Sequence, residues 1–217
     1  MPTPSPAASA SLLRHSPLLL CLSSRCFSEF SYQIATVAVG WQIYELTGSA
    51  VYLGMVGLVQ FIPSALLVFI AGHAADRYDR RRVVQACQLV EGIAAAYLGW
   101  RSFVGGATVT EIFSVLVVFG IASAFESPAL SALLPGVAPD GQLQRATALG
   151  TGAWQVSAIS GPAIGGLAYA ISPAAPYVVM AAFWLLGAAC CGAIRLDRPA
   201  EEPDPPSLDQ LFAGVKF

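Results

Sequence analysis

Six long apolar stretches, each near the length that crosses a bilayer, constrain this 217-residue chain more than any other feature. A hydrocarbon core of about 30 Å takes about 20 helical residues at about 1.5 Å each. Stretches of that length, separated by polar or Gly/Pro-rich breaks, predict helices over residues 17–44, 51–71, 83–103, 109–134, 146–171 and 174–194. The connections are short, so consecutive helices should be antiparallel neighbours. We therefore expect an all-α membrane protein, a bundle of six transmembrane helices.

The composition excludes several classes of protein. Hydrophobic residues make up 56% of the chain and charged residues only 11%, against about 25% charged in soluble domains. A net charge of -2 offers no basic excess for nucleic acid. The five cysteines lie in apolar stretches without a CxxC pair, so we expect neither a metal site nor a disulfide framework. No catalytic constellation and no phosphate-binding loop with its Lys is present, so we expect no enzyme, no cofactor and no ATP-driven transport.

The basic residues predict the orientation, because cytoplasmic loops of inner-membrane proteins are enriched in Lys and Arg. Nine of the eleven basic residues fall on one side of the predicted topology: Arg14, Arg77, Arg80, Arg81, Arg82, Arg145, Arg195, Arg198 and Lys216. The opposite side has Arg101 alone. We expect a multi-pass protein of the inner (plasma) membrane with both termini in the cytoplasm.

Three regions follow from this pattern. Residues 1–16 form a cytoplasmic segment, and residues 17–195 form the transmembrane domain. The apolar run that begins at residue 17 is longer than the ~7 to 15 residues of a signal-peptide core, so it should remain as a mature helix. Residues 196–217 begin with the acidic, proline-rich stretch LDRPAEEPDPPS, a solvated linker, and end in the start of an amphipathic segment.

The first predicted helix carries a polar stripe. Arg25, Glu29, Gln33, Thr36 and Gly40 recur at spacings of three or four residues, so they share one face. Ionisable residues inside a span are costly and suggest a wet interior site. Glu29 lies roughly 18 Å along the helix, near mid-membrane. One hypothesis makes Glu29 a proton carrier whose charge Arg25 moderates; the alternative is a fixed structural ion pair.

Other polar positions are candidates for the same interior. Gln33, Thr36, Glu91, Trp154 and Gln155 could line a cavity. The alternative for Trp154 and Gln155 is a packing or interface role, and the alternative for Glu91 is the lipid–water border. Near the end of the fourth helix, Glu126 could pair with an arginine of the basic loop and form a cytoplasmic latch. The alternative for Glu126 is a structural role.

The most specific motif is the loop sequence GHAADRYDRRRV, residues 72–83. It resembles the cytoplasmic signature G-x-x-x-D-R-x-x-R-R of the major facilitator superfamily, with matches at Gly72, Asp76, Arg77, Arg80 and Arg81. It departs at Asp79, where the family more often has Gly, although an acidic residue there is similar to the exporter subgroup of macrolide and enterobactin efflux proteins. We expect Gly72 to allow close helix approach and the arginines to anchor at lipid headgroups. An ordinary basic loop is the alternative.

A second motif lies in the fifth helix, where residues 157–167 read SAISGPAIGGL. It is similar to the family's antiporter motif G-x-x-x-G-P-x-x-G-G. Gly161, Pro162, Gly165 and Gly166 match, and Ser157 replaces the leading Gly. Small residues permit close helix contact and Pro162 removes a backbone donor, so plain packing is the alternative. In the family this motif is associated with exporters.

The resemblance covers about residues 16–196 and implies the N-terminal half of a two-half carrier, with substrate bound at mid-membrane between the halves. It implies proton-coupled efflux of a small molecule by the full-length parent. The expected partners are the lipid bilayer, a small-molecule substrate, protons, and the missing C-terminal six-helix half or a second copy. Two alternatives remain: a half-carrier that acts only as a dimer, and a membrane scaffold that transports nothing.

Overall fold

The described residues form six helices, as the sequence predicts. The computed structural model describes residues 16–139 and 141–194, without the side chains of residues 68–70 and 73–77. The helices are α2 (Ser16–Thr47), α3 (Ala50–Arg77), α4 (Arg80–Phe103), α5 (Val109–Val137), α6 (Leu143–Ile171) and α7 (Ala175–Ala193). The expected segments 1–15 and 196–217 lie outside the described residues. The largest difference in bounds is at α3, which continues to Arg77 rather than residue 71, because helical hydrogen bonding does not stop where the apolar run ends.

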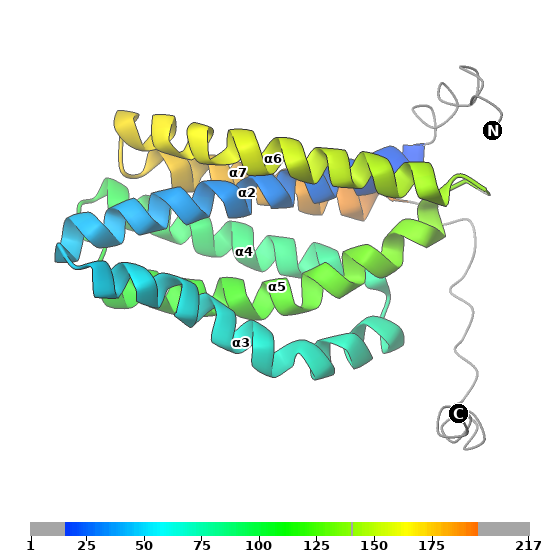
Figure 1. The fold of residues 1–217 in the computed structure, drawn as a ribbon, viewed down its shortest axis with the longest axis horizontal. Coiled ribbons are helices and arrows are strands. Elements are labelled where there is room, and N and C mark those ends of the chain that lie inside the picture. Colours follow the sequence, from blue (N-terminus) through cyan, green and yellow to red (C-terminus); the bar gives the residue numbers. More distant parts are fainter. Residues whose placement is uncertain (1–15, 140, 195–217) are drawn as a thin grey trace.

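The helices are arranged around α2 (Figure 1). This helix packs against α7 and α6 and also touches α5 and α3. On the other side, α4 lies between α7 and α5, while α3 lies at the edge of the bundle with α5 as its one extensive neighbour. Successive helices run antiparallel, so α2 begins at the same end of the bundle as α7 finishes. We call this the basic end, because the α3–α4 connection with its arginines lies there.

The interior has two apolar clusters with polar residues between them. The distal cluster, far from the basic end, includes Ile34, Phe119, Tyr177 and Trp184 from α2, α5 and α7. The basic-end cluster joins the opposite ends of the same helices: Leu18, Cys21, Val84, Leu133, Val137, Cys191 and Ile194. Between the two lie the buried polar side chains of Ser24, Ser28, Ser31, Gln88, Glu91 and Glu126. We call these six residues the polar layer.

Several helix ends carry local stop and start signals. Thr108 and Glu111 form a capping box at the start of α5, in which each side chain bonds the other's backbone N–H. The side chain of Asp79 accepts from the backbone N–H of Arg81 at the start of α4, 3.0 Å away. Gly48, Gly105 and Gly141 have φ between 62° and 72°, so the connections turn where glycine suits the backbone.

Apolar surface faces outward. Three helices of the described chain are long and apolar enough to cross a membrane, over Ala50–Leu67, Val109–Val137 and Ala175–Ala193. The first of these spans has no buried residue, and large side chains such as Phe61 and Leu66 are more than 60% exposed. On α6, Ile159 and Leu167 are each 71% exposed. The remaining helices hold more of the polar side chains, which α2 and α4 turn toward the interior.

Candidate functional site

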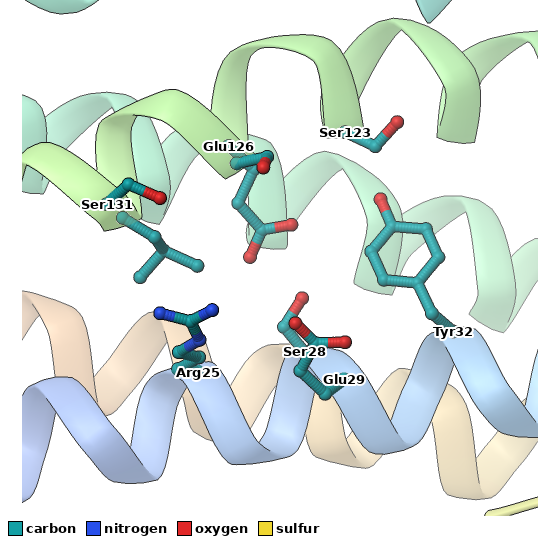
Figure 2. Close-up of a pocket in the computed structure, with 9 residues that line it drawn as sticks. Arg25, Ser28, Glu29, Tyr32, Ser123, Glu126 and Ser131 are labelled. Carbon is teal, nitrogen blue, oxygen red and sulfur yellow. The ribbon is translucent and has the colours of Figure 1, made fainter. Parts of the chain in front are cut away.

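A polar cavity of about 70 Å³ opens between α2 and α5 at the level of the polar layer. That volume has room for a few water molecules. Eight of its nine lining residues are polar or charged: Arg25, Ser28, Glu29 and Tyr32 from α2, and Ser123, Glu126, Ser127 and Ser131 from α5, with Leu130 as the ninth. Figure 2 shows Glu126 pointing from α5 toward α2, and Arg25 and Ser28 pointing back toward α5. We call this cavity the α2–α5 pocket.

The pocket brings three charged residues together without a fixed ion pair. Arg25 and Glu29 are partly buried, whereas Glu126 is 2% exposed. Neither Glu29 nor Glu126 lies within 4 Å of the Arg25 guanidinium as a salt bridge; the two ion pairs in the described chain lie elsewhere, at Arg82–Asp79 and Arg101–Glu111. Arg25 and Glu29 therefore face the same cavity but are not locked to each other. Such groups remain available to water and to a ligand.

A hydrogen-bond network ties the pocket to α4. Gln88 donates from Nε2 to Glu126 Oε1 at 2.8 Å and accepts at Oε1 from the hydroxyl of Ser24 at 3.0 Å. One turn further along α4, Glu91 accepts from the hydroxyl of Tyr32. Gln88 and Glu91 are fully buried. Three helices are thus joined through polar contacts at the depth where a membrane offers no water to replace them.

The predicted stripe on the first helix divides in the structure. Arg25 and Glu29 line the pocket, but Gln33 lies half-buried against α6 at Gly161. Thr36 is exposed, and its hydroxyl donates to the carbonyl of Tyr32 at 3.0 Å. The pocket covers only about two turns of α2, from Arg25 to Tyr32, so the later members of the stripe lie beyond it and meet other neighbours.

The remaining cavity candidates separate in the same way. Glu91 is buried in the polar layer, directly behind the pocket. Trp154 and Gln155 lie on the exposed surface of α6 and are absent from the pocket lining. Within this chain they face outward, where a membrane or another protein would meet them.

At the basic end, two arginines of the loop motif donate hydrogen bonds to backbone carbonyls of α5 and α7. Arg80 donates to the carbonyl of Ala132 on α5 at 3.1 Å, and Arg81 donates to the carbonyl of Ile194 at the end of α7. Ile194 is the C-cap of α7, where carbonyls lack intrahelical partners and a cation is favourable, and Ala132 lies in the last turns of α5. The non-family residue Asp79 has a local role as the α4 cap.

The structure does not test the expected roles of the first residues of this motif. We expected Gly72 to allow close helix approach. No described atom lies within 4 Å of where its Cβ would stand, but the side chains of residues 73–77 are not described, so this expectation stays a prediction. The side chains of Asp76 and Arg77 lie outside the described residues.

The proposed Glu126 latch takes a different form. The carboxylate of Glu126 accepts from Gln88 in the polar layer, while Arg80 and Arg81 donate to backbone carbonyls. The side chain of Arg77 is not described, so among the described loop arginines none pairs with Glu126. Pro128 and the following turns of α5 separate Glu126 from the basic end, which places its carboxylate inside the bundle.

The glycine motif of α6 makes the α2–α6 contact. A Cβ at Gly161 would collide with the side chain of Gln33, and one at Gly165 would lie 3.1 Å from the carbonyl oxygen of Ile34. Nothing lies within 4 Å of a Cβ at Gly166, and Pro162 is inside the helix. Ser157, in place of the leading Gly, is buried and donates to the carbonyl of Ala153.

Sequence reasoning missed several residues of the site. Ser24, Ser28, Tyr32 and Gln88 were not singled out, yet they line the pocket or connect it to α4. A signal was present: three serines at spacings of four and three form a second polar face on the first helix, and Gln88 and Glu91 share a face of α4. Serine is common enough in membrane helices that its spacing alone did not stand out.

Comparison with known proteins gives the context of this site. The model of the Major Facilitator Superfamily matches residues 21–216. The chain is 30% identical over 138 residues to macrolide efflux protein A of Streptococcus pyogenes, covering 64% of this chain and 34% of the relative. It is 26% identical over 212 residues to the multidrug efflux pump Tap of Mycolicibacterium fortuitum, covering 93% of this chain and 51% of that pump. A staphyloferrin A transporter of Staphylococcus aureus is 28% identical over 143 residues, or 64% and 35%. The matches thus span about a third to a half of each relative.

Proposed function

The chain belongs to the Major Facilitator Superfamily, and on that premise we propose that it supplies one half of a proton-coupled exporter of small molecules. The observation that carries the proposal is the α2–α5 pocket. It places one guanidinium and two carboxyl groups in the polar layer of a helix bundle whose outer surface is apolar. Charged groups at that depth are costly and are retained where an ion or substrate passes.

Outward transport is favoured by two independent features. The relatives include proteins named for efflux of macrolides and of multiple drugs. The α6 motif is similar to the antiporter motif associated with exporters, and two of its glycines, Gly161 and Gly165, lie at the contact with α2. The substrate would be a small compound, in keeping with the printed names of the relatives.

Glu29 is the proposed carrier of the coupling proton. It is only partly buried, it lines the pocket, and no ion-pair partner among the described side chains lies within 4 Å of it. A carboxyl group in that position can exchange a proton with pocket water in one state and lose access to it in another. Arg25, on the same wall, moderates the charge when Glu29 is ionised.

The pocket described here is one wall of a larger site. Carriers of this kind bind substrate between two helical repeats and expose it alternately by rocking one against the other. Because the chain spans about a third to a half of its relatives, we propose that a second six-helix unit completes the cavity. A second copy of this chain, or a scaffold without transport, is the competing arrangement.

In the proposed orientation the protein spans the inner (plasma) membrane and its basic end faces the cytoplasm. Nine basic residues of the sequence fall on that side and one on the other. Arg80 and Arg81 would then hold the ends of α5 and α7 close to anionic headgroups.

A charge-neutral substitution tests the coupling. In membrane vesicles that carry the complete carrier, Glu29→Gln should abolish efflux driven by an imposed pH gradient, because the amide cannot take up a proton. Glu45→Gln is the matched control: it makes the same change on the same helix, at an exposed carboxylate that accepts from Trp41 and Tyr169 rather than in the pocket.

Three results would separate the alternatives. Efflux with unchanged pH dependence in Glu29→Gln would contradict the carrier role of Glu29. Loss of efflux in both variants would point to damage unrelated to the pocket. Absence of flux for any solute in the unmodified carrier, with and without a pH gradient, would favour the scaffold.

A further inference from the structure

Two buried carboxyl groups from neighbouring helices meet behind the α2–α5 pocket. Glu91 of α4 is 0% exposed and Glu126 of α5 is 2% exposed. Gln88 donates to Glu126 and lies one helical turn before Glu91 on the same face of α4, so the two carboxyl groups occupy neighbouring positions where α4 packs on α5. Only Glu126 lines the pocket, so Glu91 stands one layer deeper.

The hydrogen-bond donors to this pair are few and uneven. Glu126 accepts from the amide of Gln88 at 2.8 Å and shares the pocket with Arg25. Glu91 accepts at Oε1 from the hydroxyl of Tyr32, while its Oε2 is buried without a partner. No Lys, Arg or His of the described chain lies within 4 Å of either carboxyl group as a salt bridge.

Among the described residues, no positively charged side chain pairs with Glu91. From α2 it meets the hydroxyl of Tyr32, with Glu29 in the pocket beyond, and from α5 it meets Glu126. On its own helix the neighbouring titratable group is Cys87. From α7 the nearby ring is that of Trp184, which packs edge-on against Tyr32 at 5.4 Å between centroids and carries no titratable group.

Electrostatics then limits the charge that this pair can hold. Moving an unpaired carboxylate into a low-dielectric interior is so costly that such a group takes up a proton instead. Two adjacent carboxyl groups cannot both ionise without strong repulsion. We propose that Glu91 and Glu126 form a buried pair that retains one proton at neutral pH, with Glu91 as the protonated member.

The different surroundings of the two residues indicate that the proton lies on Glu91. Hydrogen bonds from Gln88 and the nearby guanidinium of Arg25 favour the ionised form of Glu126. Glu91 has one neutral donor, the hydroxyl of Tyr32, whose ring packs against Trp184, and an unpartnered oxygen that can carry the proton. Gln88 and Tyr32 act as positioning residues for the pair.

This site is distinct from the proton carrier proposed above. Its existence does not depend on transport, whereas its use in coupling rests on the proposed function. Tyr32 lines the pocket and its hydroxyl also donates to Glu91. A ligand that moves Tyr32 would therefore change the environment of the buried proton without touching Glu91. The carrier would then hold one proton in the pocket and another behind it.

Infrared spectra of the purified 217-residue chain and of its variants in lipid nanodiscs test the proposal. The difference between the unmodified chain and each variant needs neither substrate nor gradient. A protonated carboxylic acid has a C=O stretch well separated from that of a carboxylate, and we expect this band at neutral pH. Glu91→Gln should remove it. Tyr32→Phe should move it to higher frequency, because the carbonyl loses its donor. Glu45→Gln, at the exposed carboxylate outside the pocket, is the control and should leave it in place.

Each outcome decides the matter. A band that survives Glu91→Gln unchanged, or the absence of any such band in the unmodified chain at neutral pH, overturns the proposal. If Glu91→Gln does not fold, Tyr32→Phe decides alone, and an unmoved band is then the contradicting result. Failure of efflux in the earlier vesicle experiment leaves this readout untouched, so the two proposals can fail separately.

Discussion

The helices α2 and α3 are joined by a short connection, yet they place their polar and apolar side chains in opposite directions. Helix α2 is surrounded by α5, α6 and α7 and buries Ser24, Ser28 and Ser31. Helix α3 packs mainly on α5, and its span Ala50–Leu67 buries no residue at all. The helix that is more polar is therefore the one inside.

This difference reflects the solvent that each helix meets. Lipid is as apolar as a leucine side chain, so an outward apolar face costs nothing and gains little from packing. Polar groups instead bond to one another, since an unsatisfied polar group in hydrocarbon has lost the hydrogen bonds it would make with water, which costs several kcal/mol. The polar layer gathers such groups between two apolar clusters.

The largest expected effect tests whether α3 faces lipid. Leu66, 73% exposed near the middle of α3, should tolerate Ala but not Arg. A central Arg disfavours membrane insertion by about 3 kcal/mol, whereas Leu contributes only about half a kcal/mol in favour. The fraction of α3 that inserts can be measured with glycosylation sites placed on either side of it. Equal insertion of Leu66→Arg and Leu66→Ala would mean that this face does not meet hydrocarbon.

Breaking the polar layer should have the next largest effect. Gln88→Leu removes the donor to Glu126 and the acceptor for Ser24, and buried groups left without partners cost about 1 to 3 kcal/mol each. Unfolding in mixed detergent micelles measures the loss. Gln155→Leu makes the same change on the exposed surface of α6 and should leave stability within about 0.5 kcal/mol. Similar losses in both variants would argue that the polar layer contributes no special stability.

The glycine motif offers a comparison within one helix. Gly161→Ala should separate α2 from α6 and cost about 1 to 3 kcal/mol, because the new Cβ meets the Gln33 side chain. Gly166→Ala should be neutral or slightly stabilising, since nothing lies within 4 Å and Ala favours helix over Gly by up to about 1 kcal/mol. The same unfolding measurement ranks the two. Equal costs would contradict the contact as the purpose of Gly161.

A single hydrogen bond should give the smallest effect. The hydroxyl of Tyr177 on α7 donates to Gln42 Oε1 of α2 at 2.5 Å inside the distal end of the bundle. Tyr177→Phe should cost about 1 kcal/mol of unfolding free energy. Tyr44→Phe, at an exposed tyrosine of α2, serves as the control and should change little. A larger loss at Tyr44 than at Tyr177 would reverse the assignment of inside and outside at this end.

Sequence periodicity and span length were sufficient for the helices, because each element is set by the thickness of a bilayer. They placed Arg25 and Glu29 in one pocket, since neighbours four apart share a face. They could not separate Gln33 from that pocket or find Gln88, because these positions depend on how α2 turns against α6 and α4. Nor could they show which glycine of the α6 motif makes a close contact: Gly161 does and Gly166 does not, and this depends on how the helices pack.

The outward apolar side chains of α3 and α6 have a practical consequence for engineering. Because the helices are held by glycine contacts and by the polar layer, the surface carries little of the information that specifies the fold. Recoding exposed positions such as Phe61, Ile159 and Leu167 with charged residues, while keeping every interior residue, gives a route to a water-soluble analogue with the same bundle and the same pocket.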